Sequence, residues 1–372
     1  MALKRSVVVG PVYPFRSGVA YCSTRLAEAL ASEDSVEIVS FSRIYPRRFY
    51  PGGDPVDPSL VDRRPAGARF TLDILNPLTW IREGLRLRRL APDRVIFVWW
   101  IWVWAIPYLV MSLLLSRKTT VVFQCHNVSD KEPSWWKSWL TNRAIARADV
   151  AIVHAGTEAD EIEKRLGSAA PRIIRGFLPV HEIPGPVPSK EEARESLEIR
   201  HSKVALFFGH IRPFKGLDVA LRAWPEVDEG TLLFVSGEVW FGDEQRYRAL
   251  ASELGIESRV RFDFTFVPET AVGERFAAAD VVLVPYRHET QSGVIMTAMY
   301  FERPVIATNV GGLAEVIEEG SNGLLIPPDD PKALSDAVNR FYRQEMEPRL
   351  TEGAREMVRR YGWDRYADEL NR

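Results

Sequence analysis

Short apolar runs alternate with amphipathic stretches along almost the whole chain. In the first half, the runs typical of strands cover 6–10, 36–41, 94–98, 120–125 and 149–154. Most of them are followed by apolar residues at helical spacing, as in residues 19–32. Strands that alternate with helices form parallel sheets, so the pattern predicts a doubly wound α/β domain.

The same alternation begins again after a proline-rich run. Residues 178–192 contain prolines without periodicity, which is typical of an extended linker. Further strands are predicted at 203–209, 231–237, 259–264, 280–285, 303–308 and 322–327, and the C-terminal stretch predicts two or more helices. The sequence therefore predicts an α/β protein with two doubly wound Rossmann-like domains, residues 1–185 and 186–372, that face each other across a cleft.

Two segments of the first half depart from this simple alternation. Val95 to Leu115 contains no charged residue and is long enough to span a bilayer. Because Arg94 leads into a β-branched and aromatic strand and Pro107 interrupts the run, we interpret it as a buried strand followed by a buried helix. Its four tryptophans, at 99, 100, 102 and 104, either fill the core or form an aromatic surface for an acceptor or a lipid. Residues 46–70 have no periodicity and predict a long functional loop.

Composition and charge narrow the class of protein. Cys22 and Cys125 cannot form a disulfide framework or a zinc site, and the N-terminus lacks the pattern of an export signal, so we expect a cytoplasmic protein. The net charge of -2 hides an asymmetry, since residues 1–185 carry +7 and the remainder -9. This asymmetry is either a chance distribution of charges over solvated faces or a sign that the first half meets an anionic partner. Its basic segment 80–94 either lies on anionic lipid or is an ordinary solvated helix face.

Polar residues follow the predicted strands of the second half, where ligands of parallel sheets bind. Arg212 and Lys215 lie on a tight turn after strand 203–209, just before a helix, and two cations at a helix start suit a phosphate or pyrophosphate. The alternative is a solvated basic loop. After strand 280–285 comes a polar loop that leads into a short helix, with Glu289, Gln291, Ser292 and Gly293. Glu289 by itself could equally be a helix cap.

The first half has two further candidates. His126 and Asn127 follow strand 120–125 directly, although a lone histidine is more often structural than chemical. Gly18 ends the first loop before a helix, where it would let a ligand approach the backbone. The glycine spacing of this loop does not match a dinucleotide fingerprint, which argues against a Rossmann dehydrogenase.

Taken together, these loops resemble the retaining family-4 glycosyltransferases with the GT-B architecture. The resemblance covers essentially the whole chain and is strongest over 203–330. It is carried by PFRSGVA, HNV at 126–128, GHIRPFKG, HETQSGV and RPVIATNVGGLAEVIEEGSNGLLIPPDDPKAL.

This resemblance implies a role for each candidate. Lys215 would neutralise the diphosphate of a nucleoside diphosphate sugar, Glu289 would face the donor sugar, and His126 would lie beside that sugar. Gly18 would let the first loop approach the phosphates. The implied reaction moves the sugar to an acceptor hydroxyl with retention, without a metal or other cofactor, and one terminal helix would return to the first domain.

Two positions differ from the family pattern. His210 stands where the family commonly has arginine, and Arg212 could substitute for it. Thr297 stands where the family commonly has a glutamate that holds the ribose hydroxyls, so the grip on the ribose should be weaker or moved.

The sequence leaves other functions open. An epimerase-like enzyme would form product without an acceptor, and a non-catalytic protein would bind nucleotide sugar without turnover. The expected partners are a nucleotide sugar and a hydroxyl-bearing acceptor, which a lipid-linked glycan, a natural product or a small polyol could supply. Peripheral contact with the inner face of a membrane is a further alternative, and no nucleic acid is expected.

Overall fold

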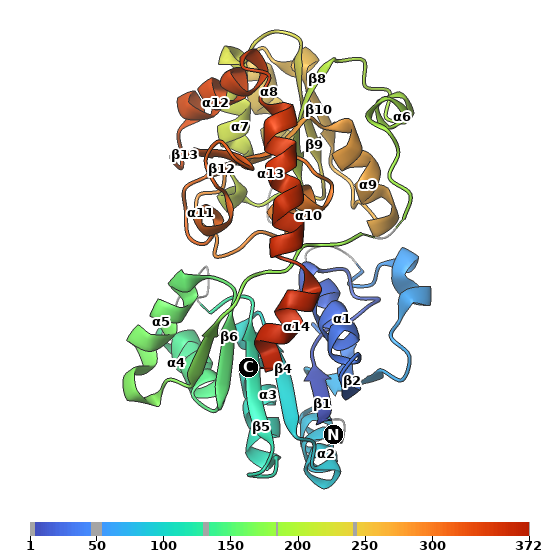
Figure 1. The fold of residues 1–372 in the computed structure, drawn as a ribbon, viewed down its shortest axis with the longest axis vertical. Helices are drawn as coiled ribbons and strands as arrows, with labels where there is room; N and C mark the ends of the chain where they lie inside the picture. Colours follow the sequence, from blue (N-terminus) through green and yellow to red (C-terminus); the bar gives the residue numbers. More distant parts are fainter. Residues whose placement is uncertain (1–3, 46–53, 129–133, 184, 241–243, 372) are drawn as a thin grey trace. The chain divides into compact units, whose positions relative to one another are not determined.

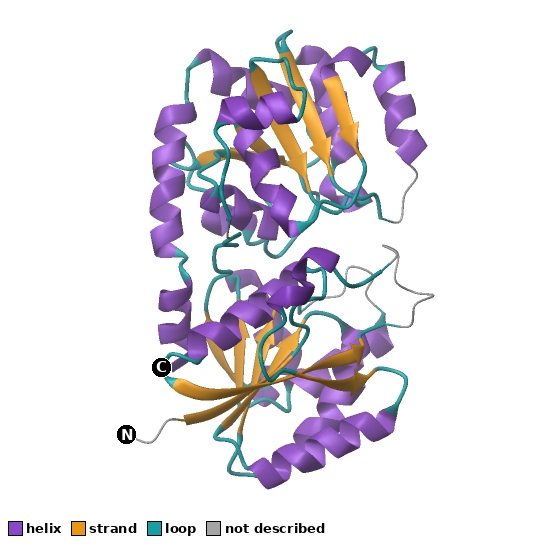
Figure 2. Cartoon of the chain, turned by 90° about the vertical axis from the view of Figure 1, so that its right-hand side faces the viewer, coloured by secondary structure: helices purple, strands orange, loops and turns teal. Residues whose placement is uncertain are grey.

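The computed structural model describes residues 4–45, 54–128, 134–183, 185–240 and 244–371 (Figures 1 and 2). The chain forms two compact units. The first comprises Met1–Pro179 together with Trp363–Arg372, and the second comprises Val180–Gly362. The chain thus passes between the units a few residues before Gly185, and its last helix belongs to the first unit.

The first unit is built on a seven-stranded parallel sheet in the order β3-β2-β1-β4-β5-β6-β7. Its strands are β1 (Lys4–Val9), β2 (Asp34–Arg43), β3 (Arg69–Asp73), β4 (Arg94–Trp99), β5 (Thr120–Cys125), β6 (Val150–Val153) and β7 (Arg172–Arg175). The central strand β1 pairs with β2 and β4. Its last three residues are completely buried valines, as expected for a parallel strand covered on both faces.

Helices cover both faces of this sheet, as the view in Figure 2 shows. They are α1 (Gly18–Leu30), α2 (Pro77–Leu90), α3 (Ala105–Leu114), α4 (Trp135–Ile145), α5 (Gly156–Leu166) and α14 (Trp363–Asn371), with 3-10 turns η2 (Pro58–Arg63), η3 (Trp102–Trp104) and η4 (Gly167–Ala169). Helix α14 packs beside α1, where the Trp363 indole donates to the Tyr21 hydroxyl at 3.2 Å. Helix α3 lies between α2 and α4.

The long loop predicted over 46–70 contains some regular structure. Residues 46–53 lie outside the described residues, but the remainder holds η2 and the start of β3. Strands β3 and β7, both absent from the predicted set, are the two edges of the sheet, and both are only partly buried. An edge strand needs no continuous apolar run, so these two gave little signal in the sequence.

The run from Val95 to Leu115 is a strand, a short turn and a helix, namely β4, η3 and α3, as predicted. Strand β4 is buried throughout, whereas α3 is buried on one side only. Trp99 and Trp104 fill the core, while Trp100 and Trp102 are half-buried. Among the described residues, no helix has the length and apolar character needed to cross a membrane.

The second unit is built on a six-stranded parallel sheet in the order β10-β9-β8-β11-β12-β13. All six strands lie where the sequence predicts them: β8 (Lys203–Phe208), β9 (Thr231–Ser236), β10 (Val260–Asp263), β11 (Val281–Val284), β12 (Val305–Thr308) and β13 (Gly323–Ile326). Five of them are largely buried and apolar, whereas the edge strand β10 carries Arg261 and Asp263 and is only partly buried.

The helices of this unit follow the strands in turn. They are α6 (Lys190–Ser196), α7 (Leu217–Ala223), α8 (Glu244–Glu253), α9 (Glu269–Ala278), α10 (Gly293–Tyr300), α11 (Leu313–Val316), α12 (Pro331–Arg343) and α13 (Glu347–Arg360), with 3-10 turns η5 (Pro213–Lys215), η6 (Trp224–Glu226) and η7 (Glu257–Arg259). Helix α13 packs against α10. The chain then leaves the unit at Gly362.

Candidate functional site

The turn after β8 in the second unit is fixed by a close backbone approach. The 3-10 turn η5 ends at Gly216, which has φ 71° and is the residue before α7. A Cβ atom at Gly216 would lie 2.0 Å from the carbonyl oxygen of Pro285, at the end of β11. The turn can therefore lie this close to β11 only because position 216 is a glycine, and this sets the position of the preceding Lys215.

The Lys215 side chain lies near Gly209, as does the first turn of α10. Its Nζ lies 5.2 Å from the ring centroid of Tyr286 and would be 3.6 Å from a Cβ added at Gly209. Val294 Cγ2 would be 3.3 Å from the same point. Lys215 and the first turn of α10 therefore both lie next to Gly209, and a cation beside a helix N-terminus is a combination that binds phosphate groups.

The start of α10 has room for a ligand. Ser292 is the N-cap, and its hydroxyl accepts from the Ile295 amide at 3.4 Å. A Cβ at Gly293 would find no atom of the described residues within 4 Å, so this first helical residue has open space beside it in the described part of the chain.

Arg287 holds this turn in place through hydrogen bonds to its backbone. The Arg287 amide donates to Phe214 O at 2.8 Å, and its Nη1 donates to Pro213 O at 2.6 Å. The same guanidinium pairs with Asp218 on α7 at 2.7 Å. Burial alone would raise the pKa of Asp218, but the hydrogen bonds and charge of Arg287 outweigh it and lower that pKa.

Arg212 and His210 share one aromatic ring. The His210 ring stacks on Trp240 with centroids 4.1 Å apart, and Arg212 Cζ lies 4.8 Å from the centroid of that indole. The Trp240 indole donates to Glu238 at 2.7 Å, which holds the ring in place. Trp240 was not among the predicted residues, although its place shortly after β9 could have indicated it.

The Glu289 loop rests on the turn after β12. Glu289 is half-buried, and its carbonyl oxygen would lie 2.0 Å from a Cβ at Gly311, which has φ 48°. Gln291 Nε2 donates to Gly312 O at 3.5 Å. Glu289, Gln291, Ser292 and Gly293 therefore belong to one braced loop and the helix start that follows it.

Thr297 lies on the buried side of α10. Its hydroxyl donates to Gly293 O, one turn earlier, at 2.8 Å. Its donor capacity is thus used within the helix, and only acceptor lone pairs remain for another partner.

In the first unit, His126 directly follows β5 and is held by its backbone. Its amide donates to Trp99 O at 2.8 Å, and its ring packs edge to face on His154 at 4.7 Å. Nε2 of His126 is buried and has no hydrogen-bond partner among the described residues. Burial lowers the pKa of His126 to about 4, so the imidazole is neutral at pH 7.

The C-terminal helix α14 contacts His154, the residue on which the His126 ring packs. The Tyr366 hydroxyl of α14 lies 3.0 Å from His154 Nε2 and accepts from Gln124 Nε2 at 2.7 Å. Glu158, which is buried, accepts from the amide of Val128 at 3.2 Å. No local sequence pattern indicates this network, because Tyr366 is far from the other residues along the chain.

Gly18 begins α1 directly after its N-cap, Ser17. A Cβ at Gly18 would meet no atom within 4 Å, so packing does not require a glycine there. The preceding loop is held by the described part of 46–70: the Arg16 amide donates to Pro55 O and the Asp57 amide to Pro14 O, both at 2.9 Å.

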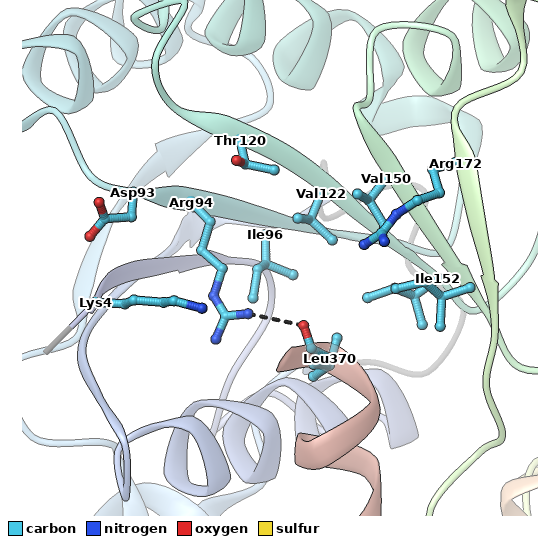
Figure 3. A pocket seen from close by; sticks show the side chains of 11 residues that line it. Lys4, Asp93, Arg94, Ile96, Thr120, Val122, Val150, Ile152, Arg172 and Leu370 are labelled. Carbon is cyan, nitrogen blue, oxygen red and sulfur yellow. Dashed lines mark hydrogen bonds between the residues drawn. The ribbon is translucent and has the colours of Figure 1, made fainter. Parts of the chain in front are cut away.

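A pocket of about 230 Å³ in the first unit contains none of the predicted residues. Figure 3 shows the pocket lined by Lys4, Arg94 and Arg172 together with Ile96, Val122, Val150 and Ile152. Arg94 is already bound to Asp34 at 2.7 Å and to Leu370 O at 3.2 Å. Within the described ranges, no group of three or more His, Cys, Asp or Glu side chains could hold a metal ion.

Two family models match the two halves of the chain. One, described as "Glycosyl transferase 4-like domain", matches residues 17–175, and the other, "Glycosyl transferases group 1", matches 202–344. The chain belongs to the family-4 glycosyltransferases of the GT-B fold. The resemblance seen in the sequence is thereby confirmed, as is the class of two parallel-sheet α/β domains.

Curated members of the family include D-inositol 3-phosphate glycosyltransferases. The one from Saccharomonospora viridis is 35% identical over 61% of this chain and 56% of its own length. The one from Corynebacterium glutamicum is 30% identical over 72% of this chain and 66% of its own length. The chain thus spans little more than half the length of some relatives that it matches.

Solved structures of other proteins share the fold of this chain at low sequence identity. Anabaena HepE in complex with UDP and glucose has a TM-score of 0.78 at 17% identity, and the match covers 98% of each chain. The sucrose-phosphate synthase of Thermosynechococcus elongatus has a TM-score of 0.74 at 17% identity, covering 99% of this chain and 98% of its own.

Proposed function

We propose that the protein is a retaining glycosyltransferase that moves a sugar from a nucleoside diphosphate sugar to an acceptor hydroxyl. The second unit would bind the donor and the first unit the acceptor. One observation carries the proposal: Lys215 Nζ and a methyl group of Val294, in the open first turn of α10, both lie close to the backbone of Gly209. A diphosphate is the part of such a donor that needs this arrangement.

Sugar transfer requires stabilisation of the negative charge that builds on the departing diphosphate. Lys215 supplies a full positive charge, the N-terminus of α10 supplies a partial one, and Arg212 adds a second cation on the same turn. We propose that these groups do so without a metal ion or other cofactor. Because Gly216 and Arg287 fix the turn beforehand, little reorganisation is needed during the reaction.

The loop that starts at Glu289 would hold the rest of the donor. Glu289 would face the sugar, where its carboxylate can accept from sugar hydroxyls and favour positive charge at the anomeric carbon. Gln291, Ser292 and Gly293 would contact the donor from the same loop. Thr297 would offer the ribose only a lone pair, a weaker contact than a carboxylate gives.

His126 and Gly18 would serve the reaction from the first unit. A neutral imidazole with a buried, unpaired Nε2 is suited to bond a hydroxyl of the sugar or the acceptor. The absence of a side chain at Gly18 would leave room for a phosphate at the start of α1. An acceptor attached to a lipid would bring this unit to a membrane surface.

UDP-sugars are the donors that we would test first, because UDP and UDP-glucose are bound by Anabaena HepE. The named relatives suggest a phosphorylated polyol as one acceptor class. A panel of UDP-, GDP-, ADP- and TDP-sugars, followed by thermal stabilisation, would identify the nucleotide. A ligand at a hundred times its Kd adds about 2.7 kcal/mol to the free energy of unfolding.

Lys215→Ala is the decisive variant, and the chain offers a matched control. Lys203 also lies 5.2 Å from the ring centroid of a tyrosine in the same unit, but far from the loops described above. We expect stabilisation by one nucleotide in the parent and in Lys203→Ala, and its loss in Lys215→Ala. Equal stabilisation of both variants would overturn the phosphate assignment.

Retention and metal independence need separate measurements. NMR of the first product formed should show the same anomeric configuration as the donor, and inversion would refute that part of the proposal. Turnover should persist after treatment with a chelator, and a loss restored by added Mg²⁺ would show that the charge of Lys215 and α10 is not sufficient.

A further inference from the structure

Helices α2, α3 and α4 leave several large apolar side chains exposed to solvent. Leu78 is 72% exposed, Leu113 61% and Trp135 81%. We define the three-helix surface by its exposed apolar residues, which are Leu78, Ile81, Leu85, Ile106, Leu113, Trp135, Trp136 and Trp139. Clusters of this kind are uncommon on proteins without a partner for that face.

The three helices form one layer, so these residues share one side of the unit. Helix α3 packs against both α2 and α4. A Cβ at Gly84 of α2 would lie 2.8 Å from Leu114 Cδ1 of α3, which shows how closely these two helices approach. Each helix turns another set of residues to the core, including Leu87 and Tyr108. The exposed apolar residues are therefore the outer face of the layer.

The charge of this layer is almost entirely positive. The helices carry Arg82, Arg86, Arg88, Arg89, Lys137 and Arg143. Their single acid, Glu83, is buried and bound to Arg86 at 2.6 Å. Arg143 lies 5.3 Å from the ring centroid of Trp139, so a cation borders the exposed tryptophans. Exposed apolar and aromatic residues beside the exposed Arg82, Arg88 and Arg89 match a surface that is apolar inside and anionic at its rim.

The tryptophans lie at the edge of the sheet where a ligand would bind. A helix that leads from one parallel strand to the next begins at the carboxyl edge of the sheet. Leu78, Ile106 and Trp135 are all in the first turns of their helices. His126 follows β5 at the same edge.

We infer that the three-helix surface docks the protein on an anionic lipid bilayer, with the tryptophans and leucines inserted at the interface and the arginines against the headgroups. The helices would lie on the bilayer and not cross it. The inference rests on the proposed function only in that a lipid-linked acceptor would then be presented near the carboxyl edge of the first sheet.

Co-sedimentation of the full chain with vesicles tests this contact. The vesicles are phosphatidylcholine alone or with about 30% phosphatidylglycerol, at low and high salt, because the attraction of arginines to anionic headgroups is screened by salt. We expect binding to the anionic vesicles that weakens with salt. Equal binding to both vesicle types, or none to either, would overturn the inference.

Two variants locate the contact. Leu78→Ser, Leu113→Ser and Trp135→Ser combined should abolish binding, and Arg82→Gln with Arg89→Gln should weaken it roughly 30-fold. Val187→Ser, an exposed valine in the second unit, and Arg340→Gln with Arg355→Gln are the matched controls and should bind like the parent. Because all replaced side chains are exposed, the variants should unfold at the parent temperature.

Two outcomes separate this inference from the other possibilities. If the parent self-associates without lipid and the triple serine variant does not, a second copy covers the surface and the lipid assignment is wrong. Nucleotide stabilisation, measured on the same variants, should be unchanged. Lys215→Ala should lose nucleotide stabilisation but keep vesicle binding, so the failure of either proposal is visible without the other.

Discussion

Replacing Gly216 by alanine tests whether a backbone approach fixes the turn that carries Lys215. Gly216 has φ 71°, and its Cβ would lie 2.0 Å from Pro285 O, whereas ordinary contact begins at 3.4 Å. The turn would have to move by about 1.4 Å. The left-handed backbone costs an L-residue roughly 1–2 kcal/mol, and overpacking adds roughly 1–3 kcal/mol. We expect a loss of roughly 2–5 kcal/mol in the unfolding free energy of the second unit.

Gly255 is the matched control for this substitution. It has φ 68°, but a Cβ there would meet no atom within 4 Å. Gly255→Ala should therefore cost only the backbone strain of roughly 1–2 kcal/mol. For a domain of this size, 1 kcal/mol lowers Tm by about 2–4 °C, so the two variants should differ clearly in calorimetry of the full chain.

The transition that a bound nucleotide shifts identifies the second unit in these scans. Gly216→Ala should lower its Tm more than Gly255→Ala and should also lose nucleotide stabilisation, because Lys215 moves with the turn. Equal drops in Tm would refute the argument that the approach to Pro285 fixes the turn. A large drop in Tm with full nucleotide stabilisation would instead refute the assignment of the turn to the diphosphate.

Two predictions concern the first unit. Burial lowers the pKa of His126 to about 4 and that of His154 below its ordinary value, so the unfolded chain binds more protons between about pH 6.5 and 4, and stability falls as the pH falls through this window. Urea midpoints at several pH values should show a shallower fall in His126→Gln than in the parent, and parallel curves would contradict the assignment. Tyr366→Phe removes the hydroxyl between His154 and Gln124 and should cost roughly 1–3 kcal/mol in urea unfolding, whereas unchanged stability would mean that the network contributes little.

Much of the fold can be predicted from the sequence, because a buried parallel strand is apolar throughout. The buried strands of the second sheet and the central strands of the first were predicted in this way, and the edge strand β10 was predicted although it carries Arg261 and Asp263. The edge strands β3 and β7 were missed, since one side of an edge strand has no neighbour and its residues need not be apolar. The candidate loops were found because parallel strands gather their carboxyl ends at one edge.

The sequence by itself determined the α/β class, the two domains, the family and the loops that carry Lys215, Glu289 and His126. Only the tertiary structure decided the contacts around these loops: Arg212 lies over Trp240, Gly216 lies against Pro285, and His154, on which His126 packs, contacts Tyr366. Hydrophobic periodicity is a local property that records which residues are buried, but it does not record their partners. Partners are set by packing between elements far apart in the chain, and the same packing leaves Trp135 and Leu78 exposed on one layer of helices.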